Sequence, residues 1–222
     1  NTPEWNEAVS FYINLVNDCG QPGPTSTGFV EAFTLMSQGQ AAMWVDATVA
    51  AGFLSDPAQS EIADSVGFAA APVGPVAKGN HWLWSWNLGI PTTTENAEEA
   101  LQFITWATSE EYINLVAERD GWATVSPGTR VSLYENESYL EAAPFAPIVL
   151  DLMQSADPTD STRDPVPYTG VQFVGIPEFQ GIGTDVSQII AEAFVGDITV
   201  EAALERANED VREAMEEAGY YE

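Results

Sequence analysis

The sequence predicts an α/β fold that is rich in helices and has few strands. Apolar residues recur at three- and four-residue steps along most of the chain, as in amphipathic helices. Short apolar segments typical of strands alternate with these patterns. The strands are too few to cover so many amphipathic helices, so we expect part of a sheet to lie outside this sequence.

The first part of the chain predicts two helices. Thr2, Pro3 and Glu4 are typical of a helix start, because they supply a cap, a proline in the first turn and an acid near the positive helix end. Gly20 ends this helix, and residues 29–37 predict the second. The first helix carries an apolar stripe formed by Trp5, Val9, Tyr12 and Val16.

Three short strands are predicted in the next part, at residues 41–47, 66–75 and 80–91, with a helical turn or two at residues 48–54. The third contains the sequence NHWLWSWNLGIP, in which every second residue from 82 to 86 is tryptophan. Alternate residues of a strand share one face, so these indoles would point the same way. They are either core residues or a stacking platform for a ligand.

The remaining chain predicts mainly helices. An extended segment, residues 171–183, precedes the last two helices, and residues 125–134 predict a loop. Helices are predicted at residues 94–108, 109–119, 145–153, 185–195 and 199–218.

The charge of the chain is strongly acidic. It has 222 residues, 34 of them Asp or Glu and 6 Lys or Arg, which gives a net charge of −28. Such a chain repels nucleic acids and anionic membranes, so we expect both to be poor partners and predict no nucleic-acid partner. At about 1 M salt the Debye length falls to about 3 Å and most of the self-repulsion disappears. We interpret the composition as an adaptation to high salt; the alternative is an acidic protein without such adaptation.

Cysteine and histidine exclude several kinds of site. Cys19 and His81 are the single cysteine and histidine, so an intrachain disulfide and a His/Cys zinc site are excluded. No nucleophile motif lies near His81 and no glycine-rich phosphate loop is present. We predict no catalytic residue, no metal and no cofactor.

Several stretches together resemble a known family. These are GQAAMWVDATVAAGFL, WLWSWNLGIP, GWATVSPGTRVSLY, PVPYTGVQFVGIPEFQGIG and VGDITVEAALERANEDVREAMEEAGY. The chain resembles the extracellular solute-binding proteins of ABC importers, and more narrowly their sorbitol/mannitol (polyol) branch. The GxAAM segment and the last helix are generic, whereas GIPEFQ beside MWVDATVAAG is more specific. The resemblance covers the whole chain but only about the C-terminal half of such a protein.

The resemblance implies a periplasmic-binding-protein-like fold of two lobes that grip a ligand between them. It assigns residues 1–87 to the second lobe, residues 88–134 to a segment that crosses back to the first, and residues 135–222 to the second lobe again. Most of the N-terminal lobe would then lie outside this sequence, and another chain could supply it. A periplasmic or extracellular location and docking on the membrane subunits of an ABC permease follow from the same resemblance.

Carboxylates, an arginine and indoles are the candidate ligand-binding groups, because a polyol offers many hydroxyls and flat C–H edges. Asp46 is the strongest candidate, with helix capping as its alternative role. Trp84 and Trp86 are either platform or core, and Arg130 binds either the ligand or a neighbouring carboxylate. The other candidates are Trp44, Asn87, Gln172 and Glu178.

The predicted function is binding of a sugar alcohol or related monosaccharide by hinge closure, without catalysis. One alternative is a glycosidase-like enzyme that uses paired carboxylates such as Asp46 and Glu178. Another is an acidic structural or interaction domain that binds no ligand.

Overall fold

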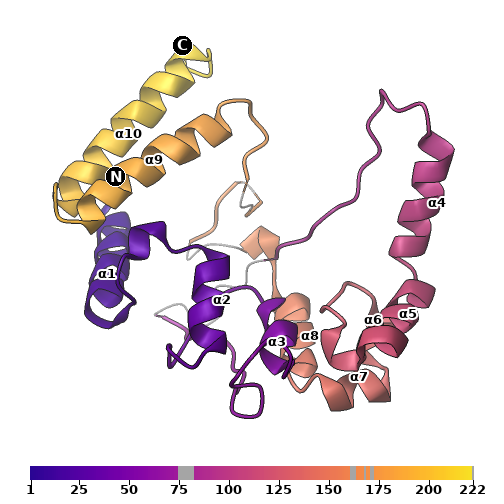
Figure 1. Ribbon diagram of the computed structural model, residues 1–222. Coiled ribbons are helices and arrows are strands. Elements are labelled where there is room, and N and C mark those ends of the chain that lie inside the picture. Colours follow the sequence, from indigo (N-terminus) through magenta and orange to yellow (C-terminus); the bar gives the residue numbers. More distant parts are fainter. Residues whose placement is uncertain (75–82, 161–163, 168, 171–172, 222) are drawn as a thin grey trace. The chain divides into compact units, whose positions relative to one another are not determined.

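A computed structural model describes residues 1–74, 83–160, 164–167, 169–170 and 173–221 (Figure 1). The chain divides into two compact units, a terminal unit of Asn1–Gly28 and Val171–Glu222 and a central unit of Phe29–Gly170. In the described residues both units consist of helices and connecting loops. None of the helices in these ranges has the length and apolar character needed to cross a membrane.

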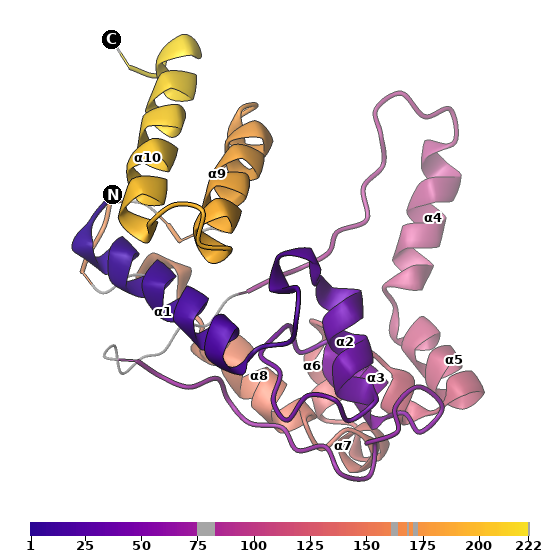
Figure 2. The same cartoon turned by 60° about the vertical axis from the view of Figure 1, so that its left-hand side comes forward.

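The terminal unit contains three long helices, α1 (Pro3–Cys19), α9 (Phe179–Phe194) and α10 (Val200–Glu217) (Figure 2). The predicted start of α1 is confirmed, because Thr2 Oγ1 accepts a hydrogen bond from the Trp5 N–H at 3.4 Å. Helices α9 and α10 pack side by side, and Gly196 between them has a φ of 83°, which a glycine adopts without steric cost.

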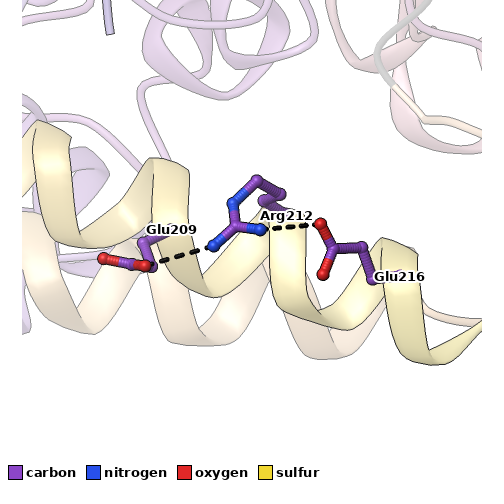
Figure 3. Close-up of polar contacts among 3 residues, drawn as sticks. All are labelled: Glu209, Arg212 and Glu216. Atoms are coloured by element: carbon purple, nitrogen blue, oxygen red, sulfur yellow. Dashed lines mark hydrogen bonds and ion pairs between the residues drawn. The ribbon is translucent and has the colours of Figure 1, made fainter. Parts of the chain in front are cut away.

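One apolar cluster joins the three helices of the terminal unit. Ile13 of α1 packs with Ile189 and Phe194 of α9 and with Ala203 and Ala207 of α10. The ends of α1 and α9 are also tied, because Asn17 Nδ2 donates to the Phe194 carbonyl oxygen at 3.4 Å. On the exposed side of α10, the Arg212 guanidinium pairs with two glutamates of the same helix, Glu209 and Glu216 (Figure 3).

The central unit is built from shorter helices around the fully buried rings of Tyr139 and Phe145. Phe68 packs edge-on against Phe145, with ring centroids 5.3 Å apart. The helices are α2 (Phe29–Ser37), α3 (Ala50–Ser55), α4 (Ala97–Ala107), α5 (Glu110–Asp120), α6 (Val131–Tyr134), α7 (Glu137–Ala142) and α8 (Ala146–Ser155). Single turns of 3₁₀ helix lie at Pro24–Ser26, Trp122–Thr124 and Pro158–Asp160, the first of them in the terminal unit.

The predicted strands are not formed in the described residues. No strand is formed at residues 41–47, 66–74 and 83–91. The remaining positions of the predicted strands, 75 and 80–82, lie outside the described residues. A strand requires a neighbour whose N–H and C=O groups complete the ladder, and the described residues supply none. The side chain of Met43, in the first of these segments, is 87% exposed. The predicted helix-rich character is confirmed, whereas the prediction of strands is corrected.

Two short helices and one helix start also differ from the sequence prediction. Residues 131–134 form α6 inside the predicted loop, and Asn136 begins α7 by accepting the Tyr139 N–H on Oδ1 at 3.0 Å. Both helices form where Leu133, Tyr134 and Tyr139 are buried. Helix α9 begins at Phe179, within the segment predicted as extended, although it contains two glycines, which disfavour a helix interior.

The two buried tyrosines of the central unit make a direct test of this core. The Tyr134 hydroxyl donates to the Gly128 carbonyl oxygen at 2.8 Å, whereas the Tyr139 hydroxyl has no hydrogen-bond partner in the described residues. A buried unpaired hydroxyl is costly, so Tyr139→Phe is expected to raise the free energy of unfolding by about 1 kcal/mol. Tyr134→Phe is expected to lower it by about 1 kcal/mol, because the Gly128 carbonyl loses its donor. Urea unfolding of both variants measures the two signs.

The buried tyrosines Tyr134 and Tyr139 predict a loss of stability at alkaline pH. Burial raises the pKa of Tyr134 to about 12, and burial followed by the charge of Tyr134 raises the pKa of Tyr139. A raised pKa in the folded state means that this stability is complete below the unfolded pKa of about 10 and declines above it. The free energy of unfolding should therefore fall from about pH 10 upward, and less steeply in Tyr139→Phe. Equal slopes in the two proteins would contradict the assignment.

Candidate ligand-binding site

Trp44 lies in the extended segment between α2 and α3 and is half-buried. Its indole contacts two phenylalanine rings of α2, Phe29 at a centroid distance of 5.3 Å and Phe33 at 6.4 Å. These rings lie four residues apart on one helix, so they share a face and present a continuous surface to the indole. Asp46 follows Trp44 by two residues in this segment, which forms no strand. The shared side of the two residues that strand alternation predicts therefore stays a prediction.

Asp46 is exposed, and its carboxylate makes one hydrogen bond in the described residues. Oδ1 accepts the backbone N–H of Ala47 at 2.6 Å. The alternative role of Asp46 as a helix cap is not supported, because the residue that precedes α3 is Val49, with no side-chain cap. Oδ2 therefore remains available to accept hydrogen bonds from a ligand.

The aromatic pair Trp84 and Trp86 is in mutual contact. The ring centroids are 5.5 Å apart with an interplanar angle of 64°, an edge-to-face arrangement that aromatic pairs favour. Trp84 is 42% exposed and Trp86 86%, so neither is a core residue of the described central unit. Two faces at this angle form a corner instead of one flat platform. Asn87, the next residue, is exposed as well.

The Arg130 side chain links the residue before α6 to the end of α4. Its Nε donates to the carbonyl oxygen of Thr108, at the C-terminal end of α4, at 2.7 Å. A cation at a helix C-terminus is electrostatically favourable. Two residues further on, Ser132 Oγ donates to Glu110 Oε1 at 2.6 Å. In the described residues, the Arg130 guanidinium therefore contacts a backbone carbonyl and not a carboxylate.

Glu178 belongs to the terminal unit, where it is half-buried before the start of α9. Its Oε2 accepts a hydrogen bond from the Tyr220 hydroxyl at 3.3 Å. It lines a cavity of about 200 Å³ between α9 and α10, together with two other carboxylates, Asp185 and Asp210. Gln172 and Trp82 lie outside the described residues.

The predicted site residues therefore fall into separate groups. The Trp44–Asp46 segment and the Trp84–Trp86 pair lie in the central unit, and Glu178 lies in the terminal unit. A second cavity, of about 120 Å³, lies beside Trp122 and Asn136, and none of the predicted site residues lines it. In the described part of the chain, no cluster of three acidic, histidine or cysteine side chains could hold a metal ion.

Sequence reasoning did not assign Phe29 and Phe33 to the site, although the structure places both against Trp44. The signal was present, since both residues lie on one face of the helix predicted at residues 29–37. Their contact with Trp44 spans more than ten residues of chain, and helical spacing carries no information about such contacts.

Solved structures with the same architecture define the class of this chain. An ABC transporter solute-binding protein from Agrobacterium vitis S4 with bound D-mannitol superimposes with a TM-score of 0.91 and 51% identity, over 98% of this chain and 52% of that one. A second one, from Agrobacterium radiobacter K84 in complex with ribitol, gives a TM-score of 0.77 over 95% of this chain and 49% of that one; at 23% identity it supports the fold alone.

Sequence comparison agrees with this class. The chain belongs to the bacterial extracellular solute-binding protein family, whose model matches residues 1–113. It is 46% identical over 217 residues to the mannitol-binding protein of Pseudomonas aeruginosa, which is 98% of this chain and 50% of the relative. The resemblance inferred from the sequence is confirmed. The chain spans about half the length of the relatives it matches.

Proposed function

We propose that this chain is part of the substrate-binding component of an ABC importer and that its ligand is a sugar alcohol of the mannitol or sorbitol type, or a related monosaccharide. The observation that carries this proposal is the 51% identity, over 98% of the chain, to a solute-binding protein that contains D-mannitol. The exposed carboxylate of Asp46, two residues after the Trp44 indole, supports it chemically.

A polyol ligand is recognised by a carboxylate together with an indole. Each hydroxyl is a hydrogen-bond donor as well as an acceptor, and a carboxylate accepts such bonds with about twice the strength of a neutral acceptor. An indole covers the C–H edge of the carbon chain while few rotatable bonds become fixed. Asp46 would accept from ligand hydroxyls, while Trp44 and the Trp84–Trp86 corner would supply apolar surface.

Binding between two lobes completes the proposal. Residues 1–87 and 135–222 would belong to the second lobe and residues 88–134 would cross to the first, which residues outside this sequence or another chain would supply. Helix α4 supports this arrangement: it buries no residue in the described fold, and its Leu101 and Phe103 are exposed. The ligand would stabilise a closed form by bridging the lobes, and that form would dock on the permease outside the cytoplasmic membrane. We propose no catalytic step.

Ligand titration tests the function. The 222-residue chain is joined to the part of the Pseudomonas aeruginosa mannitol-binding protein that it does not match, and D-mannitol, D-sorbitol, ribitol and glucose are titrated by calorimetry. We expect a polyol to bind this completed protein, and to stabilise it by about 2.7 kcal/mol at a hundredfold excess over Kd. The 222-residue chain alone should bind weakly or not at all, because no second lobe closes on the ligand.

Asp46→Ala is the matched variant in this titration. Loss of charge-assisted hydrogen bonds worth about 1.5–3 kcal/mol each should raise the Kd about a hundredfold. Asp151→Ala, which removes an exposed carboxylate from α8, should leave the Kd unchanged. No binding of any polyol by the completed wild-type protein would overturn the proposed function, and a Kd unaffected by Asp46→Ala would remove Asp46 from the site.

We also propose that the chain is adapted to high salt. The support is the net charge of −28, with Lys and Arg together at 6 of 222 residues. Carboxylates spread over the surface keep a protein dispersed, and their mutual repulsion is screened when the ionic strength is high.

A further inference from the structure

The Trp44 indole is held by side chains and not by its own backbone. Residues 41–46 make no backbone hydrogen bond to other described residues, so no ladder fixes the direction of the indole. The contacts that fix it come from α2, where Phe29 and Phe33 lie one helical turn apart. A ligand-contacting aromatic in a segment without regular structure depends on such packing for its orientation.

Phe33 connects Trp44 to the rest of the central unit. Its ring contacts the Trp44 indole on one side, and on another it meets the ring of Phe53 on α3 edge-to-face, with centroids 6.0 Å apart at 68°. Phe33 is half-buried, whereas Phe29 at the start of α2 is exposed. The Phe33 ring of α2 therefore connects the Trp44 indole to α3 through Phe53.

We propose that Phe33 is a positioning residue for ligand binding, because its ring, which also packs against Phe53 of α3, fixes the Trp44 indole two residues before Asp46. This inference rests on the proposed function, since it assigns Phe33 a role in the same site. An indole that is fixed before the ligand arrives loses no rotational freedom on binding. Without the Phe33 ring, the indole would rotate in the free protein, and ligand binding would then have to include the entropy cost of fixing it.

The Phe33→Leu variant tests the positioning role, because leucine keeps an apolar side chain but removes the ring. The first readout is fluorine NMR of the 222-residue chain labelled with fluorotryptophan, with the resonance of Trp44 identified by its loss in Trp44→Phe. We expect Phe33→Leu to shift or broaden the Trp44 resonance, and Phe33→Tyr, which keeps the ring, to leave it near its wild-type position.

The matched control is Phe103→Leu on α4, which removes a ring that contacts Trp106 at a centroid distance of 6.2 Å. This control should move the Trp106 resonance and leave that of Trp44 in place. A Trp44 resonance that is the same in Phe33→Leu and in the wild type, or that moves equally in the control, would overturn the inference.

The second readout is the Kd for D-mannitol of the completed protein described above. Phe33→Leu should raise the Kd about threefold to tenfold, Phe33→Tyr should keep it near the wild-type value, and Asp151→Ala should not change it. If the wild type binds D-mannitol and Phe33→Leu binds equally well, the positioning role is wrong and the proposed function stands. If the wild type binds none of the polyols, the proposed function is wrong, and the role of Phe33 in recognition fails with it.

Discussion

Replacement of Phe145 by alanine is expected to lower the free energy of unfolding by about 3–5 kcal/mol, which is the typical cost of removing a large buried ring. Phe145 is 1% exposed and lies in the main apolar cluster of the central unit, against Phe68 and beside Tyr139. The variant loses the transfer free energy of the ring and leaves a cavity that neighbouring helices fill only in part. Since a domain is typically stable by about 5–15 kcal/mol, a loss of this size is a large fraction of the total.

Urea unfolding followed by circular dichroism measures this effect. The matched control is Phe103→Ala, which removes the same atoms from a ring that is 59% exposed on α4 and should cost less than about 1 kcal/mol. If both variants cost the same, Phe145 is not the centre of the core. A loss that is smaller than about 1 kcal/mol for Phe145→Ala would contradict the packing of the central unit.

Salt is expected to raise the unfolding temperature by about 10 °C or more between about 0.01 M and about 1 M NaCl, because the Debye length falls from about 30 Å to about 3 Å. Two unit charges 20 Å apart in water repel by only about 0.2 kcal/mol, but a net charge of −28 contains many such pairs. The compact state holds these charges closer together than the unfolded chain does, so screening stabilises it.

Differential scanning calorimetry over a series of NaCl concentrations measures this dependence. A variant in which Glu205, Glu213 and Glu217 of α10 are replaced by glutamine should show a smaller rise, because fewer negative charges remain to be screened. These exposed glutamates form no ion pair in the described residues, so the substitutions break no contact. An unfolding temperature independent of salt would contradict the proposed adaptation.

The long helices were the most predictable part of the fold. The stripe from Trp5 to Val16 predicted α1, and Thr199 begins α10 as expected by accepting the Ala202 N–H at 3.1 Å. The short helix α7 was not predicted, although Asn136 could have indicated its start. Six residues are too few for a periodic pattern, and burial of Tyr139 decides whether they form a helix.

The candidate site was predictable only in part. The shared side of Trp44 and Asp46 stays a prediction from alternation, because residues 41–47 form no strand. Trp84 and Trp86, which the same spacing places on one face, are in contact. The bond from Arg130 to the Thr108 carbonyl joins residues 22 positions apart. A sequence alone cannot indicate such a pair, because no local period connects the two residues.

The sequence by itself determined the helix-rich class, the family, the acidic charge and the segments that carry the candidate ligand-binding groups. Each depends on local spacing, composition or matched motifs, which do not require knowledge of distant neighbours. Only the tertiary structure decided that residues 41–47 form no strand, that Phe33 contacts Trp44 and that the Tyr139 hydroxyl is buried without a partner among the described residues. The physical reason is that helical hydrogen bonds join residues four apart, whereas strand pairing and ring packing join segments that only the folded chain brings together.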